Sequence, residues 1–319
     1  MKQLIISIFA VMCMSVSISA QGQDKDFTKV FGVYEDEFAQ RVIGHMADKK
    51  FNGRETGTKE NRKIMKFIAK EFDKIGLDVQ IQRITDETLT KAIGAHKKGK
   101  AYPKEMANVI ATIPGVEADK YVVVGAHYDH LGNKVGIGIH PGADDNASGI
   151  VALLSLAKMM KAQGITPKYT ILFCAWDGEE KGLLGSKYFV ADWFKDEANA
   201  KEICYYMNFD MVGRTQYPEH PAVTFSWNDN YPELKEEFQK ILDAVEQPFR
   251  ILYEQRFGDG KGGSDYAPFS LRNIPFVAWM EDQMHEDYHK PGDTPDKIHW
   301  EKLRKTVLLS YGVLYGWVK

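Results

Sequence analysis

The sequence predicts a single α/β domain in which a mostly parallel central sheet carries helices on both faces. Three observations support this prediction. Short β-branched or aromatic runs alternate along the chain with segments of helical periodicity, which is typical of parallel sheets. No linker of distinct composition divides the chain. With 44% hydrophobic and 27% charged residues among 319, the chain has the composition of a globular protein with a large core.

Residues 1–20 have the pattern of a secretory signal peptide. Lys2 precedes an apolar run that is too short to span a bilayer, and small residues follow this run. We expect cleavage near Ala20 and export to the periplasm or beyond, with no stable membrane span in the mature chain. Cys13 is not preceded by the small residues of a lipoprotein signal, so lipidation is the minor alternative.

The mature domain, residues 21–319, is expected to begin with two amphipathic helices, over 28–50 and 59–76. In the second, apolar residues such as Ile64 and Ile68 recur at helical spacing, and the helix is expected to end at Gly76.

The remaining elements are expected to alternate between strand and helix. The runs that predict strands are DVQIQRI, ANVIATIPG, YVVVGA, YTILFCAW, ICYYMNF, FRILY and IPFVAWM. Further helices are expected over residues 147–163, 181–196, 232–246 and 298–317. The Lys-rich stretch 85–106 is the one long polar insertion and is predicted to be an irregular surface excursion.

Charge and cysteine content exclude two classes of protein. Removal of residues 1–20 takes away only Lys2, so the net charge changes from −3 to −4, and no basic surface for nucleic acid is expected. Only Cys174 and Cys204 remain, each inside an apolar run, so we expect two buried thiols and no disulfide scaffold.

Histidines and carboxylates follow four of the predicted strands, where ligands bind in open α/β sheets. The segments are HYDH (127–130), DGEE (177–180), DMVG (210–213) and EDQMHEDYHKPGDT (281–294), and PGADDNASG (141–149) adds two adjacent aspartates. Imidazole and carboxylate together suit zinc better than calcium, which takes only oxygen. The set exceeds what one tetrahedral zinc uses, so we infer two metals that share a bridging carboxylate.

Six motifs resemble a known family. In order they are HYDH, PGADDNASG, DGEEKGLLGS, NFDMVG, GGSDYAPF and YHKPGDT. They are similar to the motifs of the secreted co-catalytic zinc aminopeptidases, which include bacterial leucyl aminopeptidases. The larger family also contains glutamate carboxypeptidase and glutaminyl cyclase. The similarity runs from about residue 107 to 298, and the first hundred residues carry little of it.

The resemblance implies two zinc ions per chain and a role for each matched position. It makes His127 and Asp210 ligands of one metal, Glu180 and His289 ligands of the other, and Asp145 the bridge. Asp144 or Asn146 is then left to bond the backbone at the start of the following helix.

Glu179 would be the general base, next to the ligand Glu180. Asp129, two residues after His127, and Asp293, four after His289, are candidate acceptors that would orient the imidazoles. Ordinary turn capping is the alternative for this pair of aspartates.

The motif GGSDYAPF departs from the family pattern. Members often have Ser-Asp-His, whereas this chain has Ser264, Asp265 and Tyr266. Ser264, Asp265 and Tyr288 are therefore candidates for contact with substrate or for support of the ligands, and the Gly-rich loop 258–264 is a candidate wall of the pocket.

The resemblance implies an exported metallo-aminopeptidase that acts on peptides with a free amino terminus, through a hydroxide bridging two zinc ions. A glutaminyl cyclase with one zinc is an alternative. A carboxypeptidase is another, for which Arg214, Arg256 and Arg272 could bind the terminal carboxylate. A non-catalytic binding module on the same scaffold is the third, although no expected ligand is lost. The oligomeric state is left open.

Overall fold

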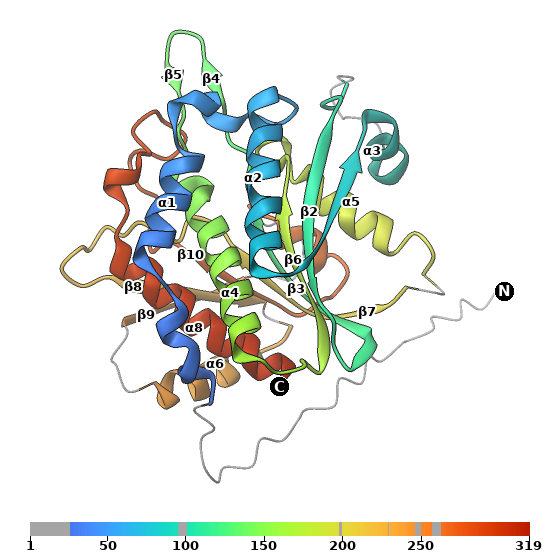
Figure 1. Cartoon of the computed structure of the whole chain (residues 1–319), viewed down its shortest axis with the longest axis vertical. Helices are drawn as coiled ribbons and strands as arrows, with labels where there is room; N and C mark the ends of the chain where they lie inside the picture. The colour runs from blue at the N-terminus through green and yellow to red at the C-terminus, as the bar shows by residue number, and fades with distance from the viewer. Residues whose placement is uncertain (1–25, 95–100, 198–199, 229, 246–249, 257–262) are drawn as a thin grey trace, which may run out of the picture.

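The computed structural model describes residues 26–94, 101–197, 200–228, 230–245, 250–256 and 263–319 (Figure 1). The predicted signal peptide lies outside these residues. Among the residues described, none of the helices has the length and apolar character needed to cross a membrane.

The core of the fold is an eight-stranded sheet in the part of the chain described, with strand order β1-β2-β6-β3-β7-β10-β8-β9. The strands are β1 (Asp78–Ile84), β2 (Met106–Ile113), β3 (Glu117–His127), β6 (Tyr169–Trp176), β7 (Glu202–Phe209), β8 (Ala222–Asn228), β9 (Arg250–Arg256) and β10 (Phe276–Met280). Strands β6, β3, β7 and β10 are parallel, whereas β1, β2 and β8 introduce antiparallel pairs. The α/β prediction is confirmed, with a sheet that is parallel in its centre.

Helices cover both faces of this sheet. One face packs against α1 (Asp36–Met46), α2 (Lys59–Ile75), α4 (Gly149–Gln163), α6 (Glu233–Ala244) and α8 (Trp300–Val318). The other packs against α5 (Leu184–Trp193) and α7 (Ala267–Ser270), with α3 (Asp86–Ile93) beside α5. Figure 1 shows α4 between α1 and α2. Most of α4 is buried, which agrees with its largely apolar sequence, and Lys161 and Ala162 near its end are exposed.

Local signals set several helix ends. Thr58 accepts a hydrogen bond from Asn61 N and caps the start of α2, and Gly76 ends α2 in the left-handed conformation. Ile64, Ile68 and Phe72 form the buried face of this helix, as the periodicity predicts.

Three expectations need correction. The helix expected over 28–50 is divided into a turn at Asp26–Val33, α1, and a turn at Lys49–Arg54. The stretch 85–106 is not irregular throughout, because a capping box between Thr85 and Thr88 starts α3, and Leu89 buries itself against α5. Strand β8 was not expected, and the hairpin of β4 (Asn133–Lys134) and β5 (Gly138–Ile139) was also missed.

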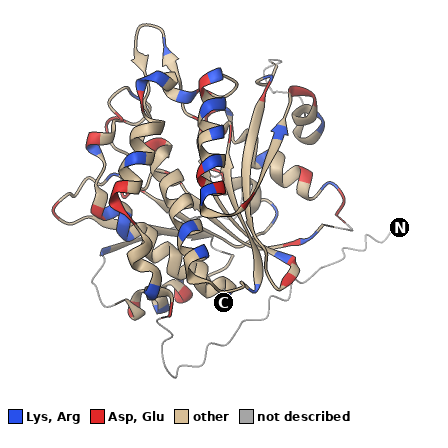
Figure 2. Cartoon of the chain, in the orientation of Figure 1, with Lys and Arg blue, Asp and Glu red and all other residues tan. Residues whose placement is uncertain are grey.

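Two expectations from composition can be compared with the structure: the state of the cysteines and the distribution of charged residues. Cys174 and Cys204 are both buried thiols, as expected. Figure 2 shows basic and acidic residues interspersed along the surface helices, as a chain with a small net charge would have.

Gly125 in β3 allows close packing beneath the carboxyl edge of the parallel strands. A Cβ atom here would overlap the Trp176 Nε1 and the Tyr206 hydroxyl, which are hydrogen-bonded to each other at 3.0 Å. Gly44 in α1 has negative φ and is exposed, and a Cβ atom there would meet nothing within 4 Å.

We therefore predict that Gly→Ala substitutions at these two positions change the free energy of unfolding in opposite directions. Gly125→Ala should lower the free energy of unfolding by about 1–3 kcal/mol, because a methyl group overpacks the core. Gly44→Ala should raise it by about 0.4–1 kcal/mol, because it restricts the unfolded chain. Urea unfolding measures both values, and equal changes would contradict the packing described for β3.

Candidate active site

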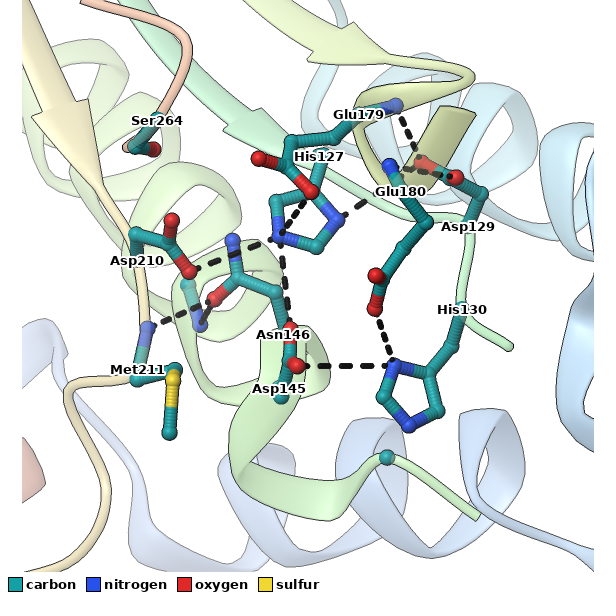
Figure 3. A network of polar contacts seen from close by, with 12 residues as sticks. His127, Asp129, His130, Asp145, Asn146, Glu179, Glu180, Asp210, Met211 and Ser264 are labelled. Atoms are coloured by element: carbon teal, nitrogen blue, oxygen red, sulfur yellow. Dashed lines mark hydrogen bonds and ion pairs between the residues drawn. The ribbon is translucent and has the colours of Figure 1, made fainter. Parts of the chain in front are cut away.

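The predicted ligand residues come from different segments and meet at the carboxyl edge of the parallel strands (Figure 3). His127 is the last residue of β3, Glu180 follows β6, and Asp210 follows β7. Asp145 lies in the helical turn Ala143–Ser148 before α4, joined to Asn146 by a cis peptide bond.

The first group consists of His127, Asp145 and Asp210. The His127 Nε2 lies 3.4 Å from Asp145 Oδ1 and 3.4 Å from Asp210 Oδ1. Bonds of about 2.0–2.1 Å in a tetrahedron place neighbouring ligand atoms about 3.3 Å apart. These three atoms therefore have the spacing of ligands around one zinc-sized ion.

The second group shares Asp145. The His289 Nε2 lies 3.3 Å from Asp145 Oδ2 and 3.2 Å from Glu180 Oε2. Asp145 thus presents one oxygen to each group, which is the arrangement needed for a bridging carboxylate.

His130 belongs to the second group, although the sequence analysis left it unassigned. Its Nδ1 lies 2.8 Å from Glu180 Oε1 and 3.6 Å from Asp145 Oδ2. Burial lowers the pKa of His130 to about 3, so the ring is neutral. Its position three residues after His127, within HYDH, was the signal that could have identified it.

Glu179 lies close to the first group, on the side of His127. Its Oε2 is 3.9 Å from His127 Nε2. Burial raises the pKa of Glu179 well above its usual range, and the neighbouring Asp210 and Asp265 raise it further against the opposing effect of His127. A carboxylate with a raised pKa in a metal site is suited to accept a proton near neutral pH.

Asp129 connects the ligand His127 to the loop of Glu179 and Glu180. Its Oδ1 is 3.6 Å from His127 Nδ1 and accepts a hydrogen bond from Glu179 N at 3.0 Å. Its Oδ2 accepts from Glu180 N at 3.3 Å and from the Thr56 hydroxyl at 2.9 Å. Asp129 therefore fixes the backbone of two acidic residues, and its carboxylate faces the His127 ring without a hydrogen bond to it.

Asp293 occupies a different place from the one expected. Among the contacts described it does not orient the His289 ring. Its carboxylate accepts from Asp144 N at 2.9 Å and from Asp145 N at 3.0 Å. Asp293 thus fixes the backbone of Asp145, the residue expected to bridge.

Asn146 bonds the backbone at the start of the following helix, as the resemblance implies, and both Asn146 and Asp144 also bond backbone groups that are distant in sequence. Asn146 Oδ1 accepts from Gly149 N, at the start of α4, and from Met211 N, both at 3.1 Å. Asp144 Oδ1 accepts from Gly213 N at 2.6 Å. These bonds tie the bridging turn to the segment that carries Asp210.

His285 lies in a separate buried group with Asp144 and Glu281. Its Nδ1 is 3.1 Å from Arg214 Nη1, which can only donate, so the ring proton must be on Nε2. This Nε2 faces Asp144 Oδ2 at 3.6 Å. A protonated Nε2 cannot bind a metal, so His285 is not a ligand in this arrangement, and its Nε2 has no hydrogen-bond partner among the described residues.

Arg54 holds the two main ligand loops together, and the sequence analysis did not single it out. Its side chain is completely buried. The guanidinium donates to Tyr128 O at 2.7 Å, to Gly142 O at 2.7 Å and to Asp145 O at 3.0 Å, and also to Pro141 O.

The remaining candidates lie around these groups. Ser264 Oγ accepts from Asn208 Nδ2 at 3.0 Å, and Asp265 Oδ1 accepts from the Ser186 hydroxyl at 2.5 Å. Burial raises the pKa of Asp265 to about 7. The Tyr288 ring stacks on His289 with 3.8 Å between ring centroids.

Tyr266, which replaces the family histidine, has a packing role. Its ring is buried and stacks on Phe276 at 4.7 Å between centroids. Of the Gly-rich loop 258–264, residues 258–262 lie outside the described residues.

The chain is similar to proteins of known family and fold. The sequence model of peptidase family M28 matches residues 108–313. Leucine aminopeptidase 1 of Leptosphaeria maculans is 30% identical over 243 residues, which cover 72% of this chain and 61% of that protein. The chain spans between 34% and 61% of the length of the first curated relatives it matches.

Solved structures share the fold. A zinc aminopeptidase from Bacillus subtilis superposes with a TM-score of 0.71 at 19% identity, over 90% of this chain and 96% of that one. A glutaminyl cyclase from Bacteroides thetaiotaomicron gives 0.67 at 18% identity, over 88% and 98%. Since an aminopeptidase and a cyclase both have this fold, the activity must be inferred from the site.

We predict that Arg54→Met lowers the free energy of unfolding by more than about 3 kcal/mol, because each buried carbonyl left without a donor costs about 1–3 kcal/mol. Arg62→Met is the matched control. Arg62 is partly exposed and pairs with Glu105 at 3.2 Å, so its loss should cost less than about 1 kcal/mol. Chemical unfolding of the metal-free proteins measures both, and similar losses would refute the role given to Arg54.

Proposed function

Because the chain belongs to peptidase family M28, we propose that it is a zinc-dependent aminopeptidase that removes residues from the free amino end of peptides. The observation that carries this proposal is the position of Asp145, whose two oxygens face two separate ligand groups. One ion would be held by His127, Asp145 and Asp210, and the other by Asp145, Glu180 and His289.

The donor set supports zinc, and two ions rather than one. Imidazole nitrogens and carboxylate oxygens at these spacings are typical zinc ligands. Asp145, Glu180 and Asp210 together bring three negative charges against the four positive charges of two zinc ions. When bound, zinc polarises a carbonyl group and makes water a nucleophile near neutral pH.

Glu179 is proposed to move the protons. It would accept a proton from the attacking water and donate one to the leaving amine, which requires a carboxylate that is close to the ligands without binding a metal. The raised pKa of Glu179 and the bond from its backbone N–H to Asp129 support this assignment.

A free amino terminus is the proposed recognition element of the substrate. This proposal follows from the similarity of the chain to leucine aminopeptidases. The arginines considered for a carboxypeptidase have other partners: Arg214 donates to Asp287 at 2.8 Å, and Arg272 pairs with Glu197 at 2.8 Å. The side chain of Arg256 lies outside the described residues.

A cyclase activity and a purely binding role receive less support. A glutaminyl cyclase with one zinc would not need the complete group around His127. A non-catalytic module would be expected to have lost a ligand or Glu179, and all of these residues are present. The signal-peptide pattern of residues 1–20 supports export as part of the proposal.

The adjacent residues Glu179 and Glu180 should differ in what they contribute. Glu179→Gln should lower kcat by about 10²–10⁴-fold, the usual value of general acid–base catalysis, with little change in metal content. Glu180→Gln should instead weaken the binding of one metal and be partly rescued by added zinc. Steady-state kinetics and metal analysis separate the two effects. Loss of a metal from Glu179→Gln, or near full activity, would refute the assignment.

Peptides with a free amino group should be cleaved and their acetylated forms should not, because the ammonium is the recognition element. Product release from matched free and N-acetylated peptides, with and without a chelator, measures this. Equal cleavage of both forms would indicate an endopeptidase, release from the carboxyl end a carboxypeptidase, and cyclisation of N-terminal glutamine a cyclase.

A further inference from the structure

We propose that His130 is a third imidazole ligand, bound through Nδ1 at the metal position formed by Asp145, Glu180 and His289. This inference rests on the proposed function, since it requires a metal at that position. It adds a residue that the motif resemblance does not assign.

The contact between His130 and Glu180 has the distance of a hydrogen bond without its geometry. His130 Nδ1 and Glu180 Oε1 are 2.8 Å apart. Both atoms are buried, and neither has a hydrogen-bond partner among the described residues, as is also true of the other ring nitrogen, His130 Nε2. Two such atoms are better explained as ligands that converge on one ion, because an unpaired buried polar atom is costly.

The packing of the ring fixes which edge faces the carboxylates. The opposite edge lies against Gly142, where a Cβ atom would come within 2.6 Å of His130 Cδ2. The Nδ1 edge therefore faces Glu180 and Asp145, as Figure 3 shows. A charged imidazolium would be costly in this buried position beside the Arg54 guanidinium, so the ring can offer a lone pair.

Glu180 lies between two imidazoles. Its Oε2 is 3.2 Å from His289 Nε2, and its Oε1 is 2.8 Å from His130 Nδ1. The two rings are 6.0 Å apart between centroids. With Asp145, this position would have ligands from four residues, within the range that zinc accepts when it expands to five bonds. The position around His127 has one imidazole, so the two ions should bind with unequal affinity.

The competing explanation is that His130 only orients Glu180 through a hydrogen bond. A ligand is scalar-coupled to its metal, whereas an orienting residue is not. Loss of an orienting residue also weakens metal binding by only about 10–100-fold in typical cases.

The direct test is proton–cadmium correlation NMR of the purified protein loaded with cadmium-113. We expect two cadmium resonances, one coupled to the ring protons of His130 and His289 and the other to those of His127. Coupling of each cadmium to a single histidine would overturn the assignment of His130. Fewer than two cadmium resonances would instead count against the proposed two-metal site.

Zinc affinity provides a second test with a matched control. His130→Ala should raise the dissociation constant of one zinc by more than about 100-fold, beyond the loss of an orienting residue, and leave the other ion bound. His140→Ala removes another buried histidine, whose ring is 6.4 Å from that of His130, and should change neither ion. A smaller effect of His130→Ala would overturn the proposal. If that variant does not fold, the NMR result on the unaltered protein decides.

Discussion

The hydrogen bonds from the Arg54 guanidinium to main-chain carbonyls fix the relative position of the two loops on which the site depends. One loop follows His127, the last residue of β3, and the other carries Asp145. Both loops lack the regular hydrogen bonding of a strand, and metal ligands must be held to within about 0.5 Å. The planar, fully buried guanidinium of Arg54 donates to both loops and so meets this requirement. Nearby carboxylates balance its charge.

Carboxylates that are not proposed as ligands provide the remaining connections. Asp129 accepts backbone N–H groups from the loop after β6, and Asp293 accepts them from the bridging turn. Asn146 joins the same turn to the segment after β7. The loops are therefore bonded to one another as well as to the sheet, where Asn146 Nδ2 donates to Phe209 O of β7, so a shift in one is transmitted to the others.

Features that depend on local sequence patterns could be predicted from the sequence, and features that depend on distant contacts could not. Strand runs followed by His or acid identified the edge of the sheet and the residues that meet there. Arg54 was missed because its partners are carbonyl groups from positions more than seventy residues away, which no local pattern reveals. His130 was missed because its contact with Glu180 exists only in the folded chain. Strand β8 is buried along its whole length and shows no alternation, and α3 lies in a Lys-rich stretch that masks Leu89.

The proposed ligands are spread over more than half of the chain, from His127 to His289, and they come from five segments that are distant in sequence. An unfolded chain therefore holds no site, since bringing these loops together requires the sheet and the Arg54 contacts. Metal binding would then favour the folded state by mass action, and hydrolysis would begin only when folding is complete. A peptidase of this kind would remain inactive while its chain is still unfolded.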